Sequence, residues 1–144
     1  GDLDYIHSVE RIGRLSNVIS INGGVQLDLM GQENAESAGT RQLSGVGGQM
    51  DFLEGAFRSK GGKGFICINS SRVTKDGERK SNILPVIPGG STISAPRTMI
   101  DCVATEYGVA RLMGKSLRER AEAMASIAHP DFREELMKYA REHF

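Results

Sequence analysis

The sequence of 144 residues has no net charge and no long apolar run, and each shortage excludes a class of protein. Its 18 basic residues balance 18 acidic ones. No basic stripe is therefore available to neutralise a phosphate backbone, which argues against nucleic acid as a partner. The longest apolar runs, at 64–68 and 83–87, fall far short of the roughly 20 residues that span a bilayer. No membrane partner is expected.

Cysteine and histidine are also scarce. Cys67 and Cys102 lie in apolar runs typical of strands, so we expect two buried, reduced thiols. The first residues, GDLDYIHSVERIGRL, lack the basic start and the apolar stretch of a signal peptide, and the expected location is the cytoplasm. His7, His129 and His143 have no metal-ligand spacing to one another or to a cysteine, so no metal site is expected.

Glycine, in contrast, is abundant, with 18 residues that occur in clusters. The stretch SGVGGQMDFLEGAF, residues 44–57, predicts a glycine-rich turn and then an amphipathic helix that opens at about Gly48. The apolar residues expected to face the core from this helix are Met50, Phe52, Leu53, Ala56 and Phe57. A helix N-terminus presents unpaired N–H groups, which suit an anion, a phosphate or an oxyanion formed during acyl transfer. The alternative is that the glycines serve only the turn.

The remaining elements predict an α/β fold with a mixed β-sheet and flanking helices. Residues 18–29, VISINGGVQLDL, have the pattern of a β-hairpin, with Val25, Leu27 and Leu29 on one face of the outgoing arm. Further strands are expected at 65–69, 83–87, 92–94 and 102–105. Helices are expected at 117–128, capped by Ser116 with Glu119 at its third position, and at 132–144.

Taken singly, the other candidate residues are weak evidence for a functional site. GVGGQM is neither the dinucleotide pattern GxGxxG nor a Walker sequence. Ser44 lacks the G-x-S-x-G context of a serine hydrolase. Glu106 follows a strand and could be a catalytic carboxylate, but a structural or hydrogen-bonding role is favoured. Lys60, Lys63 and Lys75 flank glycine turns, where solvated lysines are the usual finding.

Several unusual blocks occur in one order: INGGVQLDLMGQENAES, SGVGGQMDF, SKGGK, ATEYGVARLMGKSLRERA and IAHPDFREEL. Together they resemble the C-terminal domain of the acetyl-CoA hydrolase/transferase family, over residues 18–144. Within that family the resemblance is greatest to its 4-hydroxybutyrate and butyryl-CoA:acetate CoA-transferase branch.

The resemblance implies that the protein moves coenzyme A between short-chain carboxylates such as 4-hydroxybutyrate, butyrate and acetate. A glutamate attacks the acyl-CoA, and a glutamyl-CoA thioester then passes its CoA to a second carboxylic acid. That glutamate belongs to a segment upstream of residues 1–144, so the chain would be the C-terminal domain of a longer protein and inactive alone. The implied partners are its own N-terminal domain, small carboxylates, and further copies in a homodimer or higher oligomer. CoA or acyl-CoA is then a substrate, with no tightly bound cofactor.

The alternatives are an acetyl-CoA hydrolase, a module that binds CoA or a phosphate ligand without chemistry, and a structural domain with a disused site.

The resemblance also assigns roles to single residues. Gly48 matches the backbone N–H that holds the oxyanion or thioester carbonyl, with Gly47 beside it. Val25 matches an apolar position that contacts CoA, and Lys75 a basic position near the CoA phosphates. Relatives have an asparagine before a proline as a second oxyanion donor, where this sequence reads IHSV. Either His7 replaces that donor, or the alignment is shifted at this end.

Overall fold

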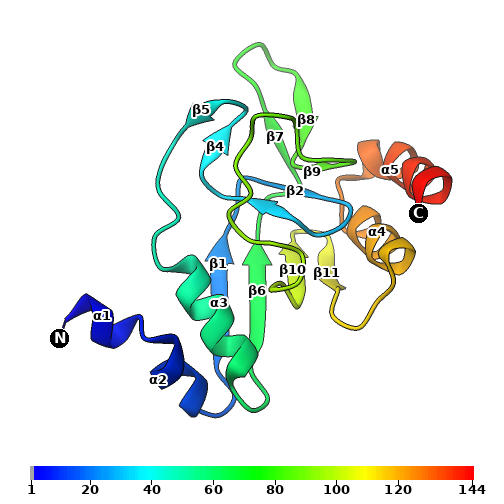
Figure 1. Cartoon of the computed structure of the whole chain (residues 1–144). Helices are drawn as coiled ribbons and strands as arrows, with labels where there is room; N and C mark the ends of the chain where they lie inside the picture. The colour runs from blue at the N-terminus through cyan, green and yellow to red at the C-terminus, as the bar shows by residue number, and fades with distance from the viewer. Residues whose placement is uncertain (1) are drawn as a thin grey trace.

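The computed structural model describes residues 2–144, and its largest sheet is mixed, with the strand order β1-β6-β10-β11. The strands β1 (Ile19–Gly23), β6 (Lys63–Cys67) and β10 (Cys102–Thr105) run parallel, and β11 (Gly108–Arg111) pairs with β10 in the antiparallel sense. Helix α3 (Gln49–Arg58) precedes β6 in the chain and packs against both β1 and β6, as Figure 1 shows. This arrangement confirms the predicted α/β class.

Smaller sheets lie beyond the carboxyl ends of β1 and β6, in the upper part of Figure 1. In one of them, β2 (Gln26–Asp28) lies between β3 (Glu33–Asn34) and β9 (Ile83–Leu84). The other two are two-stranded pairs, β4 (Ser37–Ala38) with β5 (Arg41–Gln42), and β7 (Ser71–Val73) with β8 (Arg79–Ser81).

The hairpin predicted at 18–29 is wrong. Its two arms are β1 and β2, which belong to different sheets, because β1 pairs with β6 and β2 pairs with β3 and β9. Gly23 and Gly24 carry the chain from one sheet to the other. The outgoing arm is also buried on both faces, since Gln26 and Asp28 are buried as well as Leu27. The alternating pattern therefore predicted the two strands correctly, but it did not predict which strands they pair with.

The other predicted strands are right in part. The range 102–105 is β10, and 65–69 overlaps β6. Of 83–87 only Ile83 and Leu84 pair, because Pro85 has no N–H to donate to a ladder. Residues 92–94 form no strand, and the chain there makes a single bridge from Ala95 to Glu33.

The C-terminal helices α4 (Leu117–Ser126) and α5 (Pro130–His143) pack on each other, and α4 also packs on β11. Two short helices, α1 (Leu3–Ile6) and α2 (Val9–Arg14), precede the sheet, and α2 packs against α3. Among residues 2–144, no helix has both the length and the apolar character needed to cross a membrane. The core gathers fully buried side chains from the sheet, α3 and α4, among them Leu27, Leu53, Ile66, Val103, Leu112 and Met124.

Two burial predictions need correction. Phe57 is 55% exposed because it lies on the outer side of α3, whereas Leu53 and Ala56 face the core. Cys67 is exposed at the carboxyl end of β6, although Cys102 is buried, and both thiols are free. Position along the strand, rather than the apolar neighbours in sequence, decides the exposure of a thiol.

The predicted cap of α4 is present as a reciprocal capping box between Ser116 and Glu119. We expect Ser116→Ala to lower the free energy of unfolding by about 1 kcal/mol, because the helix loses an acceptor for one of its unpaired N–H groups. Chemical denaturation measures the change. The control is Ser126→Ala at the other end of α4, whose hydroxyl donates only to the Ala123 carbonyl, 2.7 Å away. Equal effects of the two substitutions would contradict the role of the cap.

Candidate functional site

The carboxyl ends of the parallel strands meet at one edge of the largest sheet. Gly23 at the end of β1 stands opposite Cys67 in β6, and Cys67 stands opposite Ala104 in β10. An open groove of about 480 Å³ lies here, lined by Gly24, Cys67, Ile68, Asn69, Ala104 and Thr105. Helix α3 joins two parallel strands and so runs opposite to them, which brings its N-terminus to the same edge (Figure 1). Ligands of open α/β sheets bind at such an edge.

The glycine turn, residues 45–48, leads into α3, and its glycines have different reasons to be glycine. Gly47 has a φ of +60°, which disfavours any other residue, but a Cβ there would meet nothing within 4 Å. Gly48 is the N-cap of α3 and has an ordinary φ of −87°. A Cβ on Gly48 would lie 2.6 Å from Nδ1 of His7 and closer still to its Cε1. Position 47 therefore favours glycine because of its backbone conformation. Position 48 favours glycine because the imidazole ring of His7 lies too close for a side chain.

His7, which directly follows α1, is held against the glycine turn by two residues of α3. Its Nδ1 lies 3.1 Å from Oδ2 of Asp51, and its ring meets Phe52 edge-on with the centroids 5.2 Å apart. The N-cap, Gly48, has no side chain that could accept a hydrogen bond from the first turn of α3. The first N–H groups of α3 have no partner within the helix, so they remain available to a ligand. The structure thus places His7 beside Gly48, 41 positions later in the sequence.

A buried carboxyl group lies on the other side of this helix end. Glu33 is fully buried, and the side-chain amide of Gln49, the first residue of α3, donates a hydrogen bond to its Oε2. Among residues 2–144, Oε1 of Glu33 has no hydrogen-bond partner, and it would lie 2.8 Å from a Cβ on Gly24. Burial raises the pKa of Glu33 to about 7; the hydrogen bond from Gln49 opposes that rise and the charge of Glu36 adds to it. Glu33 thus links β3, the Gly24 turn and the start of α3.

Val25 follows Gly24, which lies against Glu33, and Gly48 precedes Gln49, which bonds to Glu33. Val25 is half-buried and lines a cavity of about 270 Å³ together with Gln26, Ala38, Gly39, Leu43 and Arg72. Lys75 is exposed in the turn between β7 and β8, a hairpin that projects from the top of the molecule in Figure 1. The structure therefore brings Val25, Gly47 and Gly48 to one edge, and leaves Lys75 on an extension beyond it.

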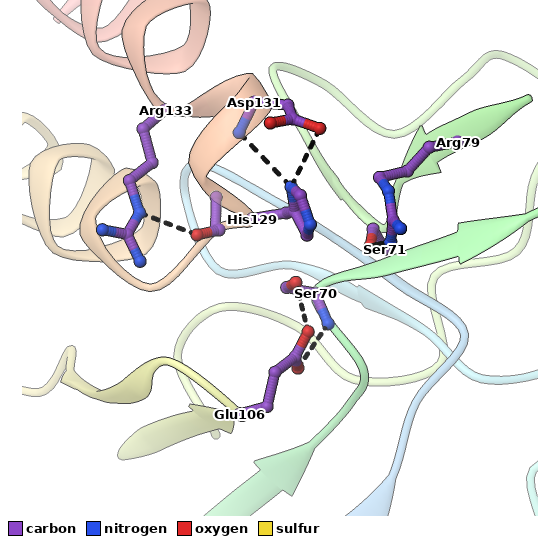
Figure 2. A network of polar contacts seen from close by, with 8 residues as sticks. Ser70, Ser71, Arg79, Glu106, His129, Asp131 and Arg133 are labelled. Atoms are coloured by element: carbon purple, nitrogen blue, oxygen red, sulfur yellow. Dashed lines mark hydrogen bonds and ion pairs between the residues drawn. The ribbon is translucent and has the colours of Figure 1, made fainter.

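Glu106 lies in the turn after β10, where Figure 2 shows it bound to Ser70. It accepts hydrogen bonds from the Ser70 N–H at 2.9 Å and from the Ser70 hydroxyl at 2.6 Å. Burial opposes ionisation of Glu106, but the two bonds from Ser70 outweigh it and lower the pKa, with a smaller contribution from His129. The hydrogen-bonding role predicted for Glu106 is confirmed, since it fixes the loop that follows β6.

Sequence reasoning missed Glu33, Gln49 and Asp51. Glu33 and Gln49 are polar residues that become buried only when β3 packs on the start of α3, and nothing in their local pattern marks this. Asp51 reads as an ordinary acidic residue in the first turn of a helix. Among residues 2–144, no group of three or more histidine, cysteine or acidic side chains is placed to hold a metal ion.

Comparison with known proteins places this chain in one family. Residues 1–140 match the model of the acetyl-CoA hydrolase/transferase C-terminal domain. The 4-hydroxybutyrate coenzyme A transferase of Clostridium kluyveri is 48% identical over 142 residues, which are 99% of this chain and 32% of that protein. The butyryl-CoA:acetate CoA-transferase of Anaerostipes caccae is 46% identical over 138 residues, 96% of this chain and 31% of that protein. Acetyl-CoA hydrolases are also among the relatives, at lower identity.

A solved structure agrees with these relatives. The crystal structure of a 4-hydroxybutyrate CoA-transferase from Porphyromonas gingivalis superposes with a TM-score of 0.76 at 42% identity, over 98% of this chain and 30% of that one. The chain belongs to the acetyl-CoA hydrolase/transferase family and corresponds to its C-terminal domain. It spans about a third of the length of the curated relatives it matches.

Proposed function

We propose that this chain is the C-terminal, CoA-binding part of an enzyme that transfers coenzyme A between short-chain carboxylates. The observation that carries the proposal is the glycine turn at the N-terminus of α3, which presents backbone N–H groups at the carboxyl edge of the sheet. Gly48, with Gly47 beside it, donates to the thioester oxygen, Val25 packs against the CoA arm, and Lys75 pairs with its phosphates. The substrates are 4-hydroxybutyrate, butyrate or acetate and their CoA thioesters.

In this proposal the nucleophile is a glutamate outside these 144 residues, which forms a glutamyl-CoA thioester. Exposed apolar side chains on β1 and on α1 support a second domain as a neighbour. The edge strand β1 exposes Ile19 to 50% and Ile21 to 68%, and Tyr5 and Ile6 of α1 are also more than half exposed. Burying such side chains is favourable, so we expect the N-terminal domain of the enzyme to cover them.

Mass spectrometry of the full-length protein after treatment with acetyl-CoA tests this function. We expect a CoA adduct on a glutamate outside residues 1–144, and CoA exchange between acetyl-CoA and butyrate. The 144-residue chain alone should show no exchange. An adduct on Glu36, Glu54 or Glu106, or turnover by the chain alone at the roughly 1–1,000 per second typical of enzymes, would contradict the proposal.

Lys75→Ala in the full-length protein should raise the KM for acyl-CoA about twofold to fivefold at low salt and leave kcat nearly unchanged. An exposed ammonium near a phosphate contributes similar binding in the ground state and the transition state, and is worth up to about 1 kcal/mol. The effect should shrink as salt rises. The control is Lys80→Ala on the same hairpin, because Lys80 already pairs with Glu78 at 3.1 Å. An unchanged KM at low salt would make Lys75 an ordinary surface lysine.

A further inference from the structure

The pair formed by His7 and Asp51 has a defined protonation pattern. A carboxylate can only accept hydrogen bonds, so the 3.1 Å contact between Nδ1 of His7 and Oδ2 of Asp51 requires the proton on Nδ1. In the neutral ring Nε2 is then unprotonated and carries a lone pair. A neutral His7 in this arrangement cannot donate a hydrogen bond from Nε2, but it can take a proton there.

The ring is also fixed in place next to the glycine turn. Asp51 holds one side of it, and Phe52 meets it edge-on at an interplanar angle of 71°. The edge formed by Nδ1, Cε1 and Nε2 faces Gly48, because a Cβ on Gly48 would be 2.6 Å from Nδ1 and 3.1 Å from Nε2. The His7 side chain remains 27% exposed, so water can reach it. A base that faces a thioester site and is open to water has the components of a hydrolytic centre.

We propose that His7 is a general base that activates water against a CoA thioester bound at Gly48, and that Asp51 positions it. The protein would then hydrolyse CoA thioesters in addition to transferring CoA. This inference rests on the proposed function, because it needs the thioester carbonyl at the Gly48 N–H.

The reaction consumes one water molecule. The water oxygen bonds to the carbonyl carbon of the thioester while its proton passes to Nε2 of His7, and the resulting oxyanion accepts from the Gly48 N–H. The intermediate then collapses: the C–S bond breaks, and the sulfur takes the proton back from Nε2. The products are a carboxylic acid and free CoA thiol, and His7 returns to its neutral form. The Asp51 carboxylate stabilises the transient imidazolium.

The experiment uses the full-length protein and two assays: CoA exchange between acetyl-CoA and butyrate, and release of free CoA thiol from acetyl-CoA without an acceptor carboxylate. His7→Gln is the main variant, because glutamine can donate a hydrogen bond but cannot act as a base. We expect it to lower thiol release about 100-fold or more, and to lower thiol release far more than exchange. Asp51→Asn, which permits the other tautomer of His7, should lower thiol release about tenfold or more.

The matched control is His129→Gln, since His129 also faces an aspartate, with Nδ1 3.5 Å from Asp131 (Figure 2), but caps α5 and not α3. It should leave both assays unchanged. The pH profile of thiol release should lose its low-pH limb in His7→Gln. Asp51 is the charged group that bonds to the ring, and Phe52 and Gly48 also contact it.

The outcomes separate the two proposals. Exchange in the wild type with no thiol release above the uncatalysed rate overturns the role of His7 and leaves the transferase function standing. Equal losses of both activities in His7→Gln, or no loss in either, also overturn it. Thiol release without exchange overturns the transferase function, and the His7→Gln variant then still decides whether His7 is the base. Absence of both activities overturns both.

Discussion

Gly48→Ala in the full-length protein is expected to lower the rate of CoA exchange about 100-fold, a loss typical of a displaced oxyanion contact. The added methyl group would stand at the entrance of the site, between the thioester and the ring of His7. Its cost to folding should be small, about 1 kcal/mol, because the backbone at Gly48 already has an ordinary φ of −87°. The atoms that the methyl group meets belong to the His7 side chain and not to the backbone.

Neighbouring glycines supply the controls for this prediction. Gly45→Ala should leave exchange unchanged, because a Cβ there meets nothing within 4 Å and its φ is not positive. Gly47→Ala should instead cost about 1–2 kcal/mol of folding stability, since its φ of +60° is unfavourable for alanine. If Gly48→Ala keeps the wild-type rate per folded molecule, the glycine turn has only a structural role.

A double substitution locates the cause of the loss. Gly48→Ala should still lower exchange when His7 is already alanine, because the methyl group then acts on the thioester itself. Were the loss to vanish in the His7→Ala background, the methyl group would act only by displacing the ring. Comparing the loss in the two backgrounds therefore tells whether a side chain at position 48 interferes with the substrate or only with the His7 ring.

Local signals in the sequence predicted those parts of the fold that depend on neighbours in the chain. The start of α3 at Gly48 and the cap of α4 at Ser116 are such features, since a turn residue or a capping hydroxyl acts on groups within four positions. The partner of β1 was not predictable in this way. An NGG sequence between two apolar runs favours a hairpin, but the pairing of β1 with β6 joins residues more than 40 positions apart.

The candidate site also has one part that local sequence signals predict and one part that they do not. Gly47 and Gly48 could be named as candidates because a glycine cluster before a helix is visible in the sequence. The contacts that give the site its chemistry are non-local: His7 with Asp51 spans 44 positions, and Glu33 with Gln49 spans 16. A buried glutamate in a short strand has no local signature, because its burial depends on how β3 and α3 pack.

That buried glutamate leads to the second large expected effect, a pH-dependent stability that Glu33→Gln removes. The unfolded chain releases the Glu33 proton near 4.5, whereas burial raises the pKa of Glu33 in the folded chain to about 7. Between these values the folded state binds more protons than the unfolded state, so the free energy of unfolding falls as pH rises and levels off above pH 7. This difference in pKa between the unfolded and the folded chain lowers the free energy of unfolding by about 3 kcal/mol at pH 8.

Glutamine keeps the shape of Glu33 and can still accept from Gln49, but it carries no charge at any pH. We therefore expect Glu33→Gln to be about 3 kcal/mol more stable than the wild type at pH 8 and to match it within about 1 kcal/mol near pH 4.5, where Glu33 is protonated. Chemical denaturation at intervals from pH 4.5 to 8 measures both curves. The control is Glu122→Gln on α4, whose exposed pair with Arg118 at 3.3 Å should contribute less than about 1 kcal/mol. Parallel curves for the wild type and Glu33→Gln would show that Glu33 is already ionised at pH 5, and that water or a ligand group reaches its second oxygen.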